Sequence, residues 1–219
     1  MNFKAAIFDL DGTLVDSLML WDVLWERFGV NYRGDGDFRP SEADDKAVRT
    51  LPLKDAMELI HRHYEMGESG EELLAEANRI MIDFYANDVQ LKPGVRAFLD
   101  HCEQRGVRMC VASATAPELL KVAMAHCDLD RYFEKIFSCA ELGVGKDKPD
   151  IFLTAGAYFG LPNEDVCVFE DSAVAVETAV GIGMQTVAIY DRFNFGQERM
   201  RAIADRYIAE GESLSDLIE

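Results

Sequence analysis

From residue 92 onward the chain alternates between helix-like and strand-like segments, and this alternation is what most constrains its fold. Helices are expected at residues 93–105, 117–125, 149–160 and 172–181, and strands at 107–112, 135–138, 166–169 and 184–189. Strands that alternate with helices through short loops are typical of a parallel sheet with right-handed crossovers and helices on both faces. The apolar run at residues 5–8 is expected to join this sheet as a central strand, and residues 206–208 as a short edge strand. The sequence therefore predicts an α/β fold.

Residues 17–88 follow a different pattern, which contains no convincing strand. Helical periodicity is present at residues 18–28, 41–50, 53–64 and 71–85. Ser17, Ser41 and Ser69 can each begin a helix, and Glu72 follows Ser69 in the spacing of a capping box. We therefore predict a helical domain at residues 16–91, inserted into a core domain made of residues 1–15 and 92–219.

The composition restricts the partners that such a chain can bind. A formal net charge of -18 opposes binding to nucleic acid and to anionic membranes, whereas a local cluster of cations can still hold a small anion. No apolar run reaches the roughly 18 residues that a membrane-spanning helix needs. Five cysteines at irregular spacing, without a Cys-x-x-Cys pair, suggest neither a disulfide framework nor a zinc site. A cytoplasmic protein is expected, because that compartment keeps thiols reduced.

Two carboxylates, Asp9 and Asp11, follow the first predicted strand directly, and Gly12 comes next. Residues i and i+2 of an extended chain point to the same side, so the two aspartates can face one small volume. Two like charges at such a short distance need a cation between them or a proton on one of them. Asp9 could then act as a nucleophile and Asp11 as a general acid. The alternative is an ordinary Asp-Gly turn after a strand.

The other predicted strands also end in polar residues. Ser113, Ala114 and Thr115 follow the second strand, residues 145–150 with Lys146 follow the third, and Glu170 and Asp171 end the fourth. Ligands of open parallel sheets bind beyond the carboxyl ends of the strands, where these side chains would meet. This convergence favours the catalytic interpretation of Asp9 and Asp11.

The roles that we assign follow from the needs of phosphoryl transfer, in which positioning and charge neutralisation do most of the work. We predict a Mg²⁺ site formed by Asp9, the backbone carbonyl of Asp11 and Asp171, with Glu170 as a further ligand or as an outer partner. Lys146 would neutralise the phosphate and Asp9. The remaining phosphate oxygens would be held by Ser113 and its neighbours. The candidate substrate-binding residues are Gly12, Thr13, Ser113, Ala114 and Lys146.

Each of these residues also has an ordinary structural interpretation. Ser113 can be a helix cap, Lys146 a solvated loop charge, and Glu170 and Asp171 acidic residues near a helix N-terminus. The structural interpretation has to hold at four strand ends at once, so we favour the site.

The order and spacing of these segments resemble the motifs of the haloacid dehalogenase-like (HAD) hydrolase superfamily, over the whole chain. Asp9 to Leu14 resembles its first motif, Ser113 its second, Lys146 its third and Glu170 to Ser172 its fourth. The resemblance implies a Rossmann-like core, dependence on Mg²⁺ and an aspartyl-phosphate intermediate on Asp9. It also implies that Asp11 protonates the leaving group and then activates water. The helical insert resembles a subfamily I cap of the β-phosphoglucomutase and phosphoglycolate phosphatase kind, with its hinge beginning at Asp16 and Ser17.

The chain departs from the family pattern at several positions. Asp147 stands where relatives commonly have proline, and it makes Lys148 a rival of Lys146 for the phosphate; we favour Lys146 from its distance to Pro149. Ala175 replaces a usual glycine. Trp21 stands where mutase relatives have a histidine. Trp21 and Trp25 lie one helical turn apart, and such a pair is expected in the core of the cap.

We therefore predict a Mg²⁺-dependent phosphatase that acts on a small phosphorylated metabolite, as a monomer or weak homodimer. A β-phosphoglucomutase-like isomerase is the first alternative, and Trp21 weighs against it. A dehalogenase is disfavoured because Asp11 would have no leaving group to protonate. The non-enzymatic alternative is a regulatory protein that binds metal or phosphate. Candidate cap residues for a second anionic group of the substrate are Arg39, Arg49, Lys54, His61, Arg62 and His63.

Overall fold

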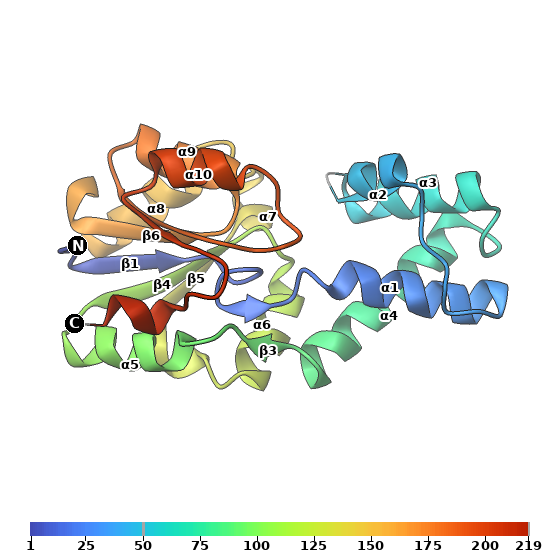
Figure 1. The fold of residues 1–219 in the computed structure, drawn as a ribbon, viewed down its shortest axis with the longest axis horizontal. Coiled ribbons are helices and arrows are strands. Elements are labelled where there is room, and N and C mark those ends of the chain that lie inside the picture. The colour runs from blue at the N-terminus through green and yellow to red at the C-terminus, as the bar shows by residue number, and fades with distance from the viewer. Residues whose placement is uncertain (50, 219) are drawn as a thin grey trace. The chain divides into compact units, whose positions relative to one another are not determined.

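The computed structural model of this chain describes residues 1–49 and 51–218, which form two compact units (Figure 1). The larger unit consists of Met1–Leu18 and Val89–Glu219, and the smaller unit is Met19–Asp88. Thr50, the predicted end of one helix of the insert, and Glu219, the predicted end of the core domain, lie outside the described residues.

The described part of the larger unit contains a six-stranded parallel sheet in the order β5-β4-β1-β6-β7-β8. Its strands are β1 (Ala5–Phe8), β4 (Arg108–Ser113), β5 (Lys135–Ser138), β6 (Val166–Glu170), β7 (Gln185–Ile189) and β8 (Arg206–Ile208). The chain places β4 and β5 on one side of β1 and the later strands on the other, so the order reverses at β1. The predicted α/β fold with a Rossmann-like parallel sheet is confirmed.

Helices cover both faces of this sheet (Figure 1). They are α5 (Val95–Gln104), α6 (Pro117–His126), α7 (Cys139–Leu142), α8 (Asp150–Phe159), α9 (Ala173–Gly181) and α10 (Gln197–Ile203). Short 3-10 turns are present at η2 (Asp130–Tyr132), η3 (Asn163–Asp165) and η4 (Leu214–Leu217). None of the helices in the described part of the chain has both the length and the apolar character needed to cross a bilayer.

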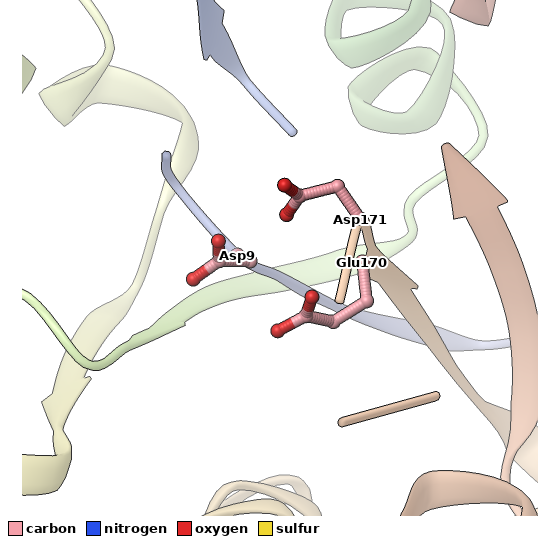
Figure 2. A group of neighbouring side chains, drawn as sticks. All are labelled: Asp9, Glu170 and Asp171. Atoms are coloured by element: carbon pink, nitrogen blue, oxygen red, sulfur yellow. The ribbon is translucent and has the colours of Figure 1, made fainter. Parts of the chain in front are cut away.

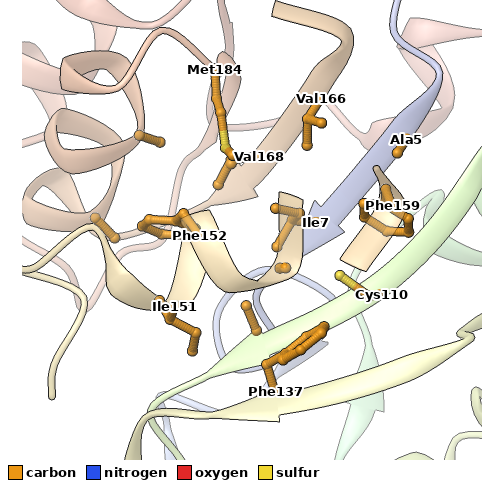
Figure 3. Packing of buried hydrophobic residues seen from close by; sticks show 14 of the residues in the cluster. Ala5, Ile7, Cys110, Phe137, Ile151, Phe152, Phe159, Val166, Val168 and Met184 are labelled. Atoms are coloured by element: carbon orange, nitrogen blue, oxygen red, sulfur yellow. The ribbon is translucent and has the colours of Figure 1, made fainter. Parts of the chain in front are cut away.

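The central strand β1 is buried on both faces because its side chains alternate between two apolar layers. Ile7 belongs to the cluster that α8 and α9 cover, where it packs with Phe152 and Val168 (Figure 3). Phe8 points to the opposite layer, where it stacks on Phe169 with ring centroids 4.4 Å apart and meets Phe98 of α5 edge-on. This packing fixes the end of β1, and with it the position of the residues that follow.

Two short strands connect the larger unit to the smaller one. Strands β2 (Val15–Asp16) and β3 (Gln90–Leu91) pair antiparallel, with Val15 opposite Leu91 and Asp16 opposite Gln90. A two-residue strand carries no periodicity, so the sequence did not predict this ribbon. Because the ribbon belongs to the larger unit, that unit extends to Leu18 and resumes at Val89, a few residues inside the predicted insert of residues 16–91.

The smaller unit is built from helices in the described residues: α1 (Leu20–Phe28), the π-helix η1 (Gly29–Arg33), α2 (Glu42–Val48), α3 (Leu53–Tyr64) and α4 (Gly70–Asn87). Ser41 and Ser69 begin α2 and α4 as predicted, since their hydroxyls accept the backbone N–H of Asp44 and Glu72. Ser17 is not a helix start: α1 begins after Met19, and the Ser17 hydroxyl binds Asp11 instead.

Candidate active site

The carboxyl ends of β1, β4 and β6 bring residues from three separate segments to one edge of the sheet. Asp9 follows β1, Ser113 ends β4, and Glu170 ends β6. The backbone N–H of Asp9 donates to the carbonyl of Phe169 at 2.9 Å, which continues the pairing of β1 with β6. The sheet thus holds the candidate nucleophile beside the candidate metal ligands, at the point where the strand order reverses.

Lys146 links two of these carboxylates. Its ammonium nitrogen Nζ lies 2.5 Å from Oδ1 of Asp9 and 2.5 Å from Oε1 of Glu170, and its side chain is 11% exposed. The other oxygen of Glu170 accepts the backbone N–H of Ser172 at 2.8 Å. Burial alone would lower the pKa of the Lys146 ammonium, but the charges of Asp9 and Glu170 outweigh burial and hold that pKa above its usual value. Lys146 is therefore a fixed positive charge beside Asp9.

Lys148, the rival of Lys146, has a different environment. Its ammonium lies 3.9 Å from Asp147, and its side chain is 64% exposed. Lys146 is thus enclosed by carboxylates and Lys148 is exposed, and the assignment of Lys146 to the phosphate stays a prediction.

Asp171 is held on both oxygens of its carboxylate. Oδ1 accepts the hydroxyl of Thr13 at 3.1 Å, and Oδ2 accepts the side-chain amide of Asn194. Gly12 passes close to the same carboxylate with a φ of +77°, and a Cβ at that position would collide with Oδ2 of Asp171. The glycine is required both for its left-handed backbone and for its lack of a side chain.

Asp9, Glu170 and Asp171 form a buried acidic cluster, in which one oxygen of each lies within 4.8 Å of the others (Figure 2). Burial raises the pKa of Asp9 to about 7, assisted by the charges of Glu170 and Asp11 and opposed by Lys146. Burial, Glu170 and Asp9 together raise the pKa of Asp171 well above its usual range. Burial first and the neighbouring charges next thus destabilise the anionic forms of Asp9 and Asp171.

The donor set of this cluster fits a divalent cation. The ammonium of Lys146 pairs with two of the three buried carboxylates, Asp9 and Glu170, so two negative charges of the cluster stay unbalanced when all three are ionised. Hard oxygen ligands around a small volume are what Mg²⁺ prefers, with waters or a phosphate completing the shell. A divalent ion would balance the excess charge.

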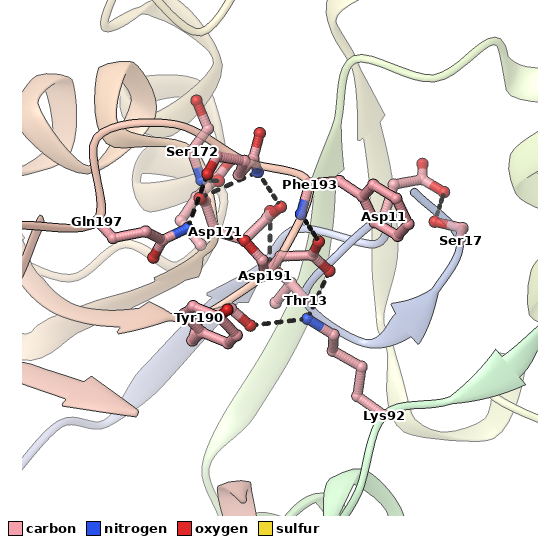
Figure 4. Close-up of polar contacts among 12 residues, drawn as sticks. Asp11, Thr13, Ser17, Lys92, Asp171, Ser172, Tyr190, Asp191, Phe193 and Gln197 are labelled. Atoms are coloured by element: carbon pink, nitrogen blue, oxygen red, sulfur yellow. Dashed lines mark hydrogen bonds and ion pairs between the residues drawn. The ribbon is translucent and has the colours of Figure 1, made fainter. Parts of the chain in front are cut away.

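Asp11 lies on the other side of the turn and is half-buried. Its Oδ1 accepts the hydroxyl of Ser17 at 2.6 Å, and its Oδ2 accepts the hydroxyl of Thr115 at 2.6 Å. Figure 4 shows Ser17 beside Asp11. Two hydroxyl donors hold the carboxylate without neutralising it. Asp11 is therefore oriented separately from Asp9, although only Leu10 separates them in the sequence.

Ser113 is almost fully buried, and its hydroxyl oxygen accepts the backbone N–H of Thr115 at 3.1 Å. Among residues 1–49 and 51–218, that hydroxyl donates no hydrogen bond, so its hydrogen is left for a ligand. Ser113 does not cap α6, which begins after Ala116. Ala114 is exposed next to it.

The backbone N–H groups of Gly12 and Thr13 are used inside the turn, by the carbonyls of Val15 and Leu10 respectively. Together with the Thr13 hydroxyl, which binds Asp171, these bonds shape the turn itself. The assignment of Gly12 and Thr13 to substrate binding stays a prediction.

Three residues that hold the carboxylates of this site had no such role in the sequence prediction: Ser17, Thr115 and Asn194. Ser17 and Thr115 are the donors to Asp11, and Asn194 is a donor to Asp171. Thr115 lies two residues after Ser113, so its place at a strand end was a usable signal. Asn194 lies in a loop after β7, a strand end that the prediction did not consider.

Within the smaller unit, the tryptophan pair is part of the packing. Trp25 is buried, and its indole N–H donates to Asp45 at 2.9 Å. Trp21 is half-buried against it, with ring centroids 5.7 Å apart, and the Arg49 guanidinium lies 5.7 Å from the Trp21 ring centroid. The Arg49 guanidinium also pairs with Asp45 at 2.8 Å.

Most of the predicted cap cations have local partners. Arg62 pairs with Glu58, and His63 with Asp44. Arg39 donates to the carbonyls of Gly36 and Phe38, and His61 contacts the carbonyl of Met66. These contacts all lie within the smaller unit, and the role of these residues in substrate binding stays a prediction.

The sequence and the fold match proteins of one family. The family model described as haloacid dehalogenase-like hydrolase matches residues 3–183. The "Probable pseudouridine-5'-phosphatase" of Drosophila melanogaster is 32% identical over 191 residues, which cover 84% of this chain and 80% of that protein. The "Phosphorylated carbohydrates phosphatase" of Thermotoga maritima is 24% identical over 218 residues, which cover 99% of each chain.

The fold is also similar to the crystal structure of CbbY from Rhodobacter sphaeroides in complex with phosphate. The TM-score is 0.78 at 21% identity, over 99% of this chain and 96% of that chain. A doubly wound sheet has a buried acidic cluster and a lysine at its switch point, and the family model and the relatives define the class of this protein as a hydrolase with an α/β fold. The chain belongs to the haloacid dehalogenase-like hydrolase family, as the motifs predicted.

Proposed function

We propose that this protein is a Mg²⁺-dependent phosphatase that hydrolyses a small phosphomonoester through an aspartyl phosphate on Asp9. The observation that carries the proposal is the pairing of Asp9 with Lys146 at 2.5 Å, inside a carboxylate cluster that leaves two negative charges unbalanced. A nucleophilic carboxylate beside a fixed cation and a cation site is the arrangement that an incoming phosphoryl group needs. Relatives named as phosphatases support the same reaction.

In the first step, an oxygen of Asp9 attacks the phosphorus atom and the bond to the ester oxygen breaks. Lys146 stays beside Asp9 and neutralises charge on the phosphoryl oxygens. Asp9 and Asp171 would hold Mg²⁺, with the backbone carbonyl of Asp11 as a third ligand, and the ion would supply further charge neutralisation. Glu170 holds Lys146 through Oε1 and accepts the backbone N–H of Ser172 through Oε2, so it would serve as an outer partner that fixes the ammonium beside Asp9.

Asp11 gives its proton to the departing ester oxygen and then removes a proton from the water that attacks the phosphoenzyme. Its two hydroxyl donors, Ser17 and Thr115, fix the carboxylate for both steps. The hydroxyl hydrogen of Ser113 would bind a phosphoryl oxygen.

The substrate that we propose is a small phosphorylated metabolite. The net charge of -18 disfavours polyanions, and the two phosphatase relatives are named for a nucleoside phosphate and for phosphorylated carbohydrates. The insert is proposed to act as the cap that selects this substrate. Five buried free thiols support a reducing compartment such as the cytoplasm.

The proposal is tested by incubating the protein and Mg²⁺ with a panel of sugar phosphates, polyol phosphates, nucleoside 5'-phosphates and phosphoglycolate, and measuring inorganic phosphate. We expect release from at least one class, its loss with EDTA, and its near-total loss in Asp9→Asn. The Asp11→Asn variant is expected to give a burst of p-nitrophenol from p-nitrophenyl phosphate followed by slow turnover, because this leaving group needs no proton.

The same experiment separates a phosphatase from a β-phosphoglucomutase-like isomerase. Isomerisation of a hexose phosphate without phosphate release would contradict the proposal. If the turnover of Asp9→Asn equals that of the unaltered protein, both the phosphatase and the isomerase hypotheses are contradicted.

A further inference from the structure

The loop of residues 190–196, between β7 and α10, lies against Asp171 through Asn194, although it matches none of the motifs. The side-chain amide of Asn194 donates to Oδ2 of Asp171 and, at 3.1 Å, to the backbone carbonyl of the same residue. Thr13 donates to the other carboxylate oxygen at 3.1 Å. Asp171 is thus fixed in position by its backbone and in rotation by both of its oxygens.

The bonds inside this loop hold Asn194 in place. The backbone N–H of Asn194 donates to the carbonyl of Asp191 at 3.1 Å. The amide of Gln197 donates to the carbonyls of Asp191 at 2.9 Å and of Asn194 at 3.1 Å. The Asp191 carboxylate accepts the backbone N–H of Phe193 at 2.9 Å. These bonds close the loop on itself and hold the backbone that carries Asn194.

An ion pair fixes this loop to the rest of the larger unit (Figure 4). Lys92, the first residue after β3, donates from Nζ to Asp191 Oδ2 at 2.8 Å and to the carbonyl of Tyr190 at 3.0 Å. The two side chains are 14% and 3% exposed, so neither charge is well screened by water. The backbone N–H of Lys92 also donates to the carbonyl of Leu14, beside the turn that carries Gly12 and Thr13. Lys92 therefore joins the two segments that supply the donors to Asp171.

We propose that Asn194 is a positioning residue that orients Asp171 for the bound cation, and that the Lys92–Asp191 ion pair holds the loop that carries it. This inference rests on the proposed function, in which Asp171 is a Mg²⁺ ligand. A carboxylate that already has its final orientation loses little rotational freedom on binding a metal, whereas a loose one must first be ordered. Outer partners of metal ligands typically account for a 10- to 100-fold difference in metal affinity.

The test measures direct binding of Mn²⁺, an oxygen-preferring ion with a paramagnetic signal, to the full-length protein. Asn194→Ala and Asn194→Leu remove the amide, the second with a similar volume. We expect the dissociation constant for Mn²⁺ to rise about 10- to 100-fold in both variants. At saturating metal the KM for the phosphomonoester should stay near that of the unaltered protein, because the loop acts through Asp171.

The matched control is Asn163→Ala. Its amide also donates to a backbone carbonyl, that of Ile182 at 2.7 Å, but it lies on the turn η3 before β6 and does not contact the cluster. This variant should bind Mn²⁺ as the unaltered protein does. A folded Asn194→Ala protein whose dissociation constant rises by less than about threefold would overturn the inference.

Lys92→Met tests the second part of the inference independently. It keeps the volume of the side chain and removes the donor, so the loop is no longer fixed by the ion pair. We expect weaker Mn²⁺ binding than in the unaltered protein and a smaller loss than in Asn194→Ala. Unchanged binding in a folded Lys92→Met protein would remove the ion pair from the inference.

The result for Asp171→Asn separates this inference from the proposed function. Loss of Mn²⁺ binding in Asp171→Asn without a change in Asn194→Ala would leave the proposed metal site standing and overturn only the role of Asn194. Unchanged binding in Asp171→Asn would overturn the metal site itself.

Discussion

Lys146 and Lys148 lie two positions apart and have opposite environments. The first is enclosed between Asp9 and Glu170, and the second is exposed beside Asp147. An enclosed ammonium in a site with little water acts far more strongly on a phosphoryl group than a solvated one. Substitution of Lys146 therefore tests the site, and the same substitution of Lys148 is a control with the same side-chain chemistry.

We expect Lys146→Met to lower kcat/KM for phosphate release by about 10²- to 10³-fold, the usual cost of removing one preorganised charge from a transition state. Lys148→Met should stay within about twofold, because exposed charges contribute little. Steady-state kinetics of both variants at saturating Mg²⁺ gives the comparison. A larger loss in Lys148→Met than in Lys146→Met would show that the third motif is misassigned.

Gly12 offers a second test at the scale of one residue. Alanine at this position both enters the left-handed region and collides with the carboxylate of Asp171. Gly106 has a similar φ of +69°, but a Cβ there meets nothing within 4 Å. Gly12→Ala should therefore lower the free energy of unfolding by more than Gly106→Ala, whose cost is the backbone strain of about 1–3 kcal/mol alone.

Denaturant unfolding of both variants measures this difference. Gly12→Ala should also weaken binding of Mn²⁺ through the displaced Asp171, whereas Gly106→Ala should not. Equal losses of stability would mean that Asp171 moves away from the new methyl group at no cost.

The residues of the site differ in how far the sequence could predict them. Asp9, Lys146, Glu170 and Asp171 stand at strand ends, and strand ends of a parallel sheet converge whatever the loops do. Asn194 reaches Asp171 because a loop folds back on itself through hydrogen bonds that involve Asp191 and Gln197. A loop of this kind has no sequence periodicity from which it could be predicted. Ser17 had the sequence signature of a helix start, but its hydroxyl binds Asp11, which lies six residues earlier.

At the scale of elements, the strands of the sheet were predicted to within one residue at each end. The predicted limits of β1, β5 and β8 coincide with the observed ones, although only β1 among these three is buried along its whole length. Helix α10 (Gln197–Ile203) was not predicted. It is short and mostly exposed, with Met200 as its one fully buried residue among those described, so it carries too few apolar positions to show a period.

Helix α4 begins at a cap that makes a clear prediction. The hydroxyl of Ser69 accepts the backbone N–H of Glu72 at 3.1 Å, and the Glu72 carboxylate accepts the N–H of Glu68 at 2.6 Å. Ser69→Ala should lower the free energy of unfolding by about 1 kcal/mol, and Ser69→Asp, which restores an acceptor, by much less. Chemical denaturation monitored by far-ultraviolet circular dichroism measures both. An equal loss in both variants would exclude the cap as the cause.

At the scale of the whole molecule, the net charge of -18 and the buried acidic cluster both favour the binding of protons and cations. The pKa of Asp9 rises from 3.8 to about 7 because of burial first and of Glu170 and Asp11 next, against Lys146. The folded protein without metal thus binds more protons than the unfolded chain between about pH 4 and pH 7. The contribution of Asp9 to stability is present below that range and is lost as the pH rises through it. Asp171 shifts in the same direction.

Mg²⁺ competes with these protons, so its stabilising effect should grow with pH. We expect the difference in Tm between samples with Mg²⁺ and with EDTA to be larger at about pH 8 than at about pH 5.5. At a Mg²⁺ concentration of about a hundred times Kd, the bound ion should add about 2.7 kcal/mol to the free energy of unfolding. Asp171→Asn serves as the control and should show little difference at either pH. A Mg²⁺ effect that shrinks as the pH rises would contradict the assignment of these carboxylates.

The antiparallel pairing of β2 with β3 places the entry and the exit of the insert side by side, with Asp16 opposite Gln90. The strand order of the sheet and the residues of the acidic cluster thus do not depend on the segment between Leu18 and Val89. In evolutionary terms, this ribbon is a site of insertion, at which a different helical insert can replace residues 19–88 without a change in the order or register of the strands. The chemistry of the family can then stay constant while its substrates diverge.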